Sequence, residues 1–162
     1  MNVTTAMFEL DEVKFHLPIK VVPKQSYRSL RMRGGYRDPK VTANMDLIRR
    51  LLMARRPAGW AMLTGPLGLT VRFESKWRMS DRQEVRDQGY VWKDTRPDGD
   101  NLVKGLQDAL ETVIYADDAK VCKWDVSVAW SWFDRVLCRV YRLCDSPGRC
   151  IIEAGDRCDD DR

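Results

Sequence analysis

One stretch of this chain combines four aspartates and a lysine in a spacing that suits a divalent-metal site. Asp98 and Asp100 are two residues apart, so at the end of an extended segment both carboxylates point to one side. Asp117 and Asp118 follow after one amphipathic segment, so all four carboxylates could converge on one point. Lys104 lies one helical turn beyond Asp100 and can share its helix face.

This donor set predicts chemistry on phosphates. Mg²⁺ prefers hard oxygen ligands and keeps several waters, so two to four carboxylates are a suitable half-cage. A metal held there can lower the pKa of a water molecule and offset charge on a leaving oxygen. A nearby lysine adds positive charge where negative charge accumulates in the transition state. The pattern therefore indicates metal-assisted phosphodiester hydrolysis.

The same residues also have structural interpretations. Adjacent aspartates are common in turns, and Asp100 can serve only as a helix cap. Lys104 and Asp108 are four residues apart, so they can form a simple surface ion pair. Spacing alone leaves the metal site and the structural interpretation open.

The charge distribution indicates a polyanionic partner. Residues 20 to 56 contain eleven Lys and Arg against two acidic residues, whereas residues 94 to 125 contain eight acidic residues against four basic ones. A basic segment of this kind can approach nucleic acid, and the acidic one would need metal to do so. Residues 20–42 are rich in Pro and Gly and predict a loop. Its basic side chains are the candidate DNA contacts: Lys24, Arg28, Arg31, Arg33, Arg37 and Lys40.

Composition bounds the class of protein. A chain of 162 residues with 44% hydrophobic and 32% charged residues is expected to fold as one domain with its own core. No apolar run reaches membrane-spanning length, no signal peptide is apparent, and no P-loop or dinucleotide glycine motif predicts an organic cofactor. We expect a cytoplasmic protein in which the five cysteines, lacking zinc-type spacing, are reduced thiols.

Periodicity predicts an α+β domain, a mixed β-sheet packed with two main helices, over residues 1–144, followed by a flexible acidic tail, 145–162. Residues 79–92 read as an inserted loop between the second strand and second helix. The predicted N-cap of that helix is Asp100 or Asn101, and its apolar stripe is Leu102, Leu106, Ala109, Leu110 and Val113. The remaining elements are a helix at 43–55 and strands at 12–19, 67–77, 122–132 and 136–143.

The acidic stretch resembles a family motif. The run from Asp98 through Asn101 to Lys104, then Asp108-Ala-Leu, then Tyr115-Ala-Asp-Asp-Ala-Lys-Val, is similar to the RusA family of Holliday junction resolvases. The similarity extends over roughly residues 12–143. The resemblance implies a homodimeric, Mg²⁺-dependent endonuclease of bacterial or phage type that cuts four-way DNA junctions by paired symmetric incisions.

The resemblance also implies roles for matching positions. Asp98, Asp100 and Asp118 match the family's metal-binding aspartates, and Lys104 matches its catalytic lysine. Asp117 is an additional candidate metal ligand, Asp108 is a recurrent acidic position, and Asn101 is a supporting residue. In a dimer, Trp124, Trp130 and Trp132 can contribute to the subunit interface as well as to the core.

Two other functions stay open on the sequence. One is a nuclease for flaps or replication forks without preference for four-way junctions. The other is a non-catalytic DNA-binding module, in which the basic loop contacts phosphates and the aspartates only cap and solvate the fold. The 79–92 insertion and the tail differ from the family core, so they bear on substrate preference more than on catalysis.

Overall fold

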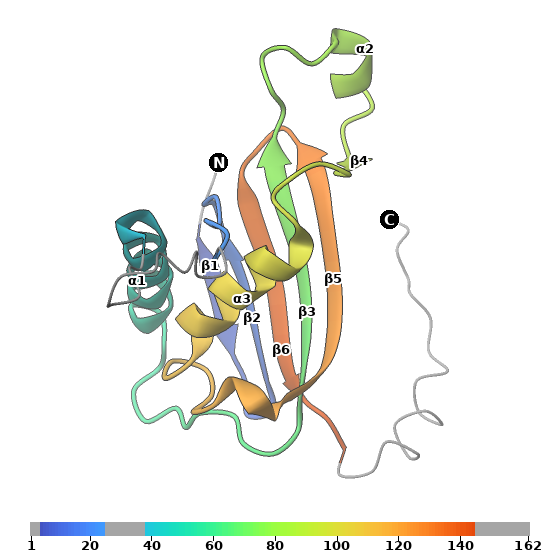
Figure 1. Cartoon of the computed structure of the whole chain (residues 1–162). Coiled ribbons are helices and arrows are strands. Elements are labelled where there is room, and N and C mark those ends of the chain that lie inside the picture. Colours follow the sequence, from blue (N-terminus) through green and yellow to red (C-terminus); the bar gives the residue numbers. More distant parts are fainter. Residues whose placement is uncertain (1–3, 25–37, 145–162) are drawn as a thin grey trace, which may run out of the picture.

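A mixed six-stranded sheet forms the body of the molecule in the computed structural model, which describes residues 4–24 and 38–144 (Figure 1). The strands lie in the order β1-β2-β6-β3-β5-β4, and every neighbouring pair is antiparallel except β3 and β5. The strands are β1 (Thr5–Phe8), β2 (Glu12–Leu17), β3 (Leu67–Lys76), β4 (Val91–Trp92), β5 (Val121–Ser131) and β6 (Arg135–Arg142), and the helices are α1 (Pro39–Met53), α2 (Gln83–Arg86), α3 (Gly99–Leu110) and the short 3₁₀ helix η1 (Asp118–Lys120). The predicted α+β class is confirmed.

Two helices, α1 and α3, cover one face of the sheet (Figure 1). Alternate residues of β3 point to that face and are buried, namely Leu69, Val71 and Phe73. They meet the apolar sides of the helices, including the fully buried Leu106 and Ile48. Leu102, Ala109 and Leu110 lie on the same buried side of α3, as the predicted stripe requires.

The parallel pairing of β3 with β5 determines where α3 lies. Parallel neighbours need a crossover connection, and here the chain returns through α2, β4 and α3 before β5 begins. The predicted inserted loop therefore contains one short helix, and the short strand β4 at its end pairs with Ala129 and Trp130 of β5.

Several boundaries differ from the sequence prediction. The N-cap of α3 is Asp98 rather than Asp100 or Asn101, and two further differences have local reasons. Helix α1 begins at Pro39 rather than at residue 43, because Asp38 Oδ1 accepts the amide of Lys40 at 2.9 Å and proline is preorganised for a first helical turn. Strand β2 ends at Leu17 because Pro18 follows and has no amide to donate. The unpredicted β1 is only four residues long and pairs with β2 at the sheet edge.

Candidate active site

The start of α3 presents two of the predicted aspartates and the predicted lysine to solvent. Asp98 occupies the N-cap position with extended backbone (φ −71°, ψ 144°), yet its side chain makes no capping hydrogen bond. Asp100 lies in the first turn, and Lys104 Nζ donates to its Oδ2 at 3.1 Å. The two side chains are 62% and 56% exposed, so this pair is open to a ligand.

The electrostatics of this helix end favour negative charge. The hydrogen bond from Lys104 holds the pKa of the Asp100 carboxyl below its usual range. The positive end of the helix dipole stabilises carboxylates in the first turn in the same direction. Asp100 is therefore ionised throughout the neutral pH range, as a cation ligand has to be.

The other two aspartates lie at the start of β5. Asp117 Oδ1 accepts the amide of Ala119 at 2.9 Å and so caps η1, whose first residue is Asp118. Gly99, by contrast, lies against Val126 and Val128, because a Cβ on it would be 3.7 and 3.3 Å from their methyl groups.

The two pairs of aspartates are therefore separated along β5. Val121 and Val126 are five residues apart, which is roughly 17 Å at about 3.3 Å per residue. Among residues 4–24 and 38–144, no three His, Cys, Asp or Glu side chains are grouped closely enough to hold a metal ion. The chain thus brings Asp98, Asp100 and Lys104 together, but not Asp117 and Asp118 with them.

Asp108, further along α3, has a different environment. Lys24 Nζ forms an ion pair with its carboxylate, and Arg49 Nη2 donates to its backbone carbonyl at 2.5 Å. Lys104 pairs with Asp100 rather than with Asp108. Asp108 therefore links three parts of the chain, which is a structural role.

The basic segment starts beside the Asp100 end of α3. The amide of Lys24 donates to the carbonyl of Asn101 at 3.0 Å. Gly105 allows this close approach, since a Cβ there would be 3.0 Å from the carbonyl oxygen of Val22. Lys40 is exposed in the first turn of α1. The other four candidate DNA contacts lie outside the described residues: Arg28, Arg31, Arg33 and Arg37.

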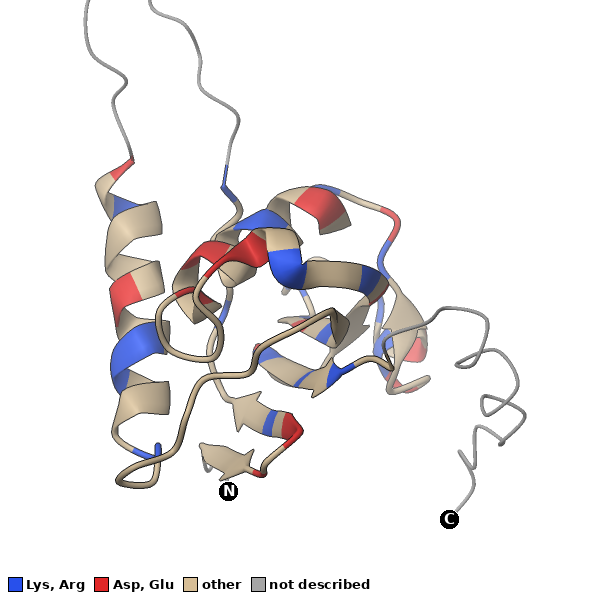
Figure 2. Ribbon diagram, turned by 90° about the horizontal axis from the view of Figure 1, so that it is seen from below, with Lys and Arg blue, Asp and Glu red and all other residues tan. Residues whose placement is uncertain are grey.

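Figure 2 shows the charges that surround this region: Lys and Arg positions are interspersed with Asp and Glu over the helices. The comparison with protein families decides what kind of protein carries them. The model of the family described as endodeoxyribonuclease RusA matches residues 18–141. The chain belongs to the RusA family of endodeoxyribonucleases.

A bacterial relative extends the comparison. An uncharacterized protein of Bacillus subtilis (strain 168), YqaN, is 33% identical over 90 residues, which is 52% of this chain and 63% of that protein. The chain thus matches less than two thirds of this relative's length.

A lysine that the sequence prediction did not include holds the loop before Asp98. Lys93 Nζ donates to the backbone carbonyls of Thr95 at 2.5 Å and Arg96 at 2.8 Å, and lies 5.1 Å from the centre of the Trp130 ring. Burial lowers its pKa, with further lowering from nearby cations, whereas Asp98 acts in the opposite direction. Lys93 thus fixes the loop that leads into Asp98, through contacts that no sequence spacing reveals.

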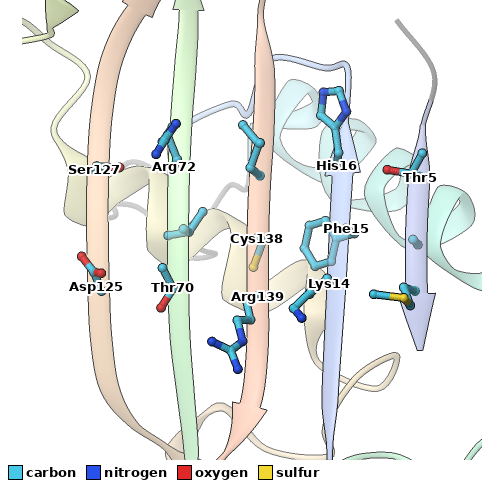
Figure 3. Close-up of a pocket in the computed structure, with 14 residues that line it drawn as sticks. Thr5, Lys14, Phe15, His16, Thr70, Arg72, Asp125, Ser127, Cys138 and Arg139 are labelled. Atoms are coloured by element: carbon cyan, nitrogen blue, oxygen red, sulfur yellow. The ribbon is translucent and has the colours of Figure 1, made fainter. Parts of the chain in front are cut away.

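A groove of about 700 Å³ lies on the opposite face of the sheet, with the helices behind it (Figure 3). Its charged residues are partly neutralised within the fold. Glu12 forms ion pairs with Lys14 and with Arg139, the latter at 2.6 Å. The sheet separates this groove from Asp98 and Asp100, so the groove and the acidic residues are different sites.

The cysteines correct one expectation. Cys122 is free and exposed, and Cys138 is free and buried, but Cys144 is disulfide-bonded. The prediction of five reduced thiols is therefore wrong at Cys144, because sequence spacing does not show which thiols folding brings within bonding distance.

Among the described residues, none of the helices has the length and apolar character that a membrane span requires.

Proposed function

We propose that this chain is a Mg²⁺-dependent endodeoxyribonuclease that resolves four-way DNA junctions in recombination and repair, acting as a homodimer through paired symmetric incisions. The observation that carries the proposal is the RusA family match over residues 18–141, which contains the exposed group Asp98, Asp100 and Lys104.

The side chains at the start of α3 fit a hard divalent cation. The side chain of Asp98 makes no capping hydrogen bond, so both of its oxygens are available, and Asp100 is ionised and exposed. Mg²⁺ is commonly held by one or two carboxylates together with several waters, so this pair is a sufficient anchor. A divalent ion bound there would supply the means to activate water and to offset charge on the phosphate.

Lys104 has two parts in this proposal. In the free protein its ammonium orients the Asp100 carboxylate through the 3.1 Å hydrogen bond. With DNA present, the same exposed ammonium would lie beside a phosphate held at Asp100. There it offsets the negative charge that builds up when the phosphodiester bond breaks.

Asp118 takes part through a second copy of the chain. Asp118 lies just before the start of β5, whereas the start of α3 lies over Val126 and Val128 of that strand. We therefore propose that Asp118, with Asp117 beside it, faces the Asp98 and Asp100 of the partner. A two-fold dimer then has two equivalent sites, and a four-way junction presents two equivalent scissile phosphates to them. Paired incisions follow from that symmetry.

The basic segment supplies affinity for the DNA backbone. Lys24 lies next to Asn101, so the chain enters this segment within a few residues of the acidic group. Cations placed there neutralise phosphates on either side of the cut, and their contribution weakens as salt increases. The proposed contacts are Arg28, Arg31, Arg33, Arg37 and Lys40, and Lys24, whose ammonium is paired with Asp108 in the free protein, would contribute at the entry to the segment.

The decisive experiment incubates the full chain with Mg²⁺ and a labelled synthetic four-way junction. We expect symmetric nicks that disappear with EDTA, and cleavage at least 100-fold slower in Asp100→Asn with junction binding retained. Asp46→Asn is the matched control, since Asp46 is also an exposed helical aspartate paired with a basic residue on its own helix.

Two results would overturn the proposal. Unchanged cleavage by Asp100→Asn would remove the site assignment, and equal rates on junction, flap and fork substrates would remove the junction preference.

A further inference from the structure

The outer edge of β5 has unused hydrogen-bonding capacity. On that side β4 pairs only with Ala129 and Trp130, and Lys93 bonds to Val128. Among the described residues, no strand pairs with that edge between Val121 and Ser127. The five consecutive residues 122–126 are all exposed, including Trp124 at 51% and Val126 at 38%. Such an edge is a template for another strand.

The direction of the free backbone groups is determined by β4. The carbonyl of Val128 accepts the amide of Lys93 at 3.0 Å on the outer side. Successive residues of a strand alternate in the side to which their backbone groups point. The N–H and C=O groups of Val126, Trp124 and Cys122 therefore also point outward. Lys123, Asp125 and Ser127 bond inward to β3.

We infer that this edge pairs with the same edge of a second copy, antiparallel, with the two-fold axis at Trp124. The inference rests on the proposed homodimer and specifies how it forms. Trp124 is the midpoint of the unpaired stretch 121–127, so pairing about it uses all the available backbone. Trp124 then lies opposite itself in a hydrogen-bonded pair, and Cys122 lies opposite Val126 of the second copy.

Charge complementarity favours the β5 edge of a second copy as the partner strand, paired in this register. Pairing about Trp124 places Lys123 of each copy opposite Asp125 of the other, in the non-hydrogen-bonded positions where side chains approach most closely. An axis at Lys123 or at Asp125 would instead place like charges opposite each other. The stretch is thus self-complementary in both hydrogen bonding and charge, as an isologous interface requires.

The same register has a consequence for the acidic residues. It places Val126 opposite Cys122, and Val128 opposite Lys120, of the second copy. The start of α3 lies over Val126 and Val128, and η1 ends at Lys120. Asp98 and Asp100 of one copy therefore come to the end of β5 where Asp118 of the other copy lies. A single arrangement therefore pairs the free edge of β5 and brings Asp98 and Asp100 of one copy near Asp118 of the other.

Charge reversal tests the interface through the oligomeric state, without any DNA. Sedimentation of the full chain should show a dimer that is weakened at least about tenfold by Lys123→Asp or by Asp125→Lys, since each change creates two repulsive pairs. The double variant Lys123→Asp/Asp125→Lys should restore the dimer. Lys76→Asp, an exposed lysine on β3, is the matched control and should have no effect.

A second pair of variants does not depend on charge. Trp124→Ala should weaken the dimer, whereas Trp132→Ala should not, although Trp132 is similarly exposed at 45%. Thermal unfolding of each variant checks that the fold is retained.

The outcomes separate the interface from the proposed function. A wild-type monomer, a dimer indifferent to both reversals, or failure of the double variant to recover would overturn the interface, whatever the cleavage assay shows. Dimerisation that follows the expected pattern without Mg²⁺-dependent cleavage would retain the interface and overturn the nuclease.

Discussion

The two ends of α3 carry the same residue type in opposite situations. Asp100, in the first turn, is 62% exposed, and its carboxylate accepts a hydrogen bond from Lys104 on its own helix. Asp108, about two turns later, is 20% exposed and is paired with Lys24, 84 positions away in sequence. The first half of the helix is open to a ligand, and the second half ties the fold together.

This difference teaches that position on a helix does not determine the role of a carboxylate. Both aspartates lie within the residues that match the RusA family model, and both have a lysine within reach. What separates them is the chain packed alongside: Lys24 and Arg49 converge on Asp108, while no other described part of the chain bonds to the carboxylate of Asp100. An exposed carboxylate paired only within its own helix can bind a cation, whereas one paired with a distant part of the chain stabilises the fold.

Mixing two inactive variants tests whether the divided aspartates work across a dimer, and carries the largest expected effect. Asp100→Asn and Asp118→Asn should each lower junction nicking at least 100-fold. Co-refolded together, they should recover nicking, because a mixed dimer has one site with both aspartates intact. Random pairing would restore about a quarter of the sites. The measurement is the initial rate of nicking of a labelled junction.

The outcome distinguishes two geometries. A site contained in one chain predicts no recovery on mixing, since each chain lacks one of its own ligands. Refolding Asp100→Asn with Asp98→Asn is the matched control. Both changes fall in the same half-site, so recovery there would contradict a site divided between Asp98 and Asp100 of one copy and Asp118 of the other.

Asp108→Asn should affect stability and leave catalysis in place. The change removes the ion pair with Lys24, which is only partly buried, so we expect a loss of about 0.5–1 kcal/mol. For a chain of this size that lowers the unfolding midpoint by about 1–4 °C. Calorimetry measures it, with Asp46→Asn as the more exposed comparison. A 100-fold loss of nicking with an unchanged midpoint would assign Asp108 to the active site.

Much of the fold and half of the candidate site were predictable from sequence because their causes are local. The apolar stripe of α3 and the alternation in β3 and β6 follow from residues a few positions apart. The pairing of Lys104 with Asp100 needs only one helical turn. Asp117 and Asp118 looked equally close, but the length of α3 and of β5 separates them from Asp100. The contacts of Asp108 and Lys93, and the bond at Cys144, depend on distant parts of the chain.

Lys104→Ala should change the pKa of Asp100, and this change is the smallest of the effects expected here. The hydrogen bond from Lys104 lowers this pKa, so its removal should raise the pKa toward the value of an unpaired aspartate. The pair stabilises the folded chain at neutral pH, and this contribution is lost as acid protonates Asp100. Carboxyl ¹³C NMR measures the titration, and Lys104→Arg, which retains a donor and the charge, should shift it less. If Asp100 titrated identically in all three proteins, the low pKa would come from the helix end alone, and Lys104 would be free to act on DNA.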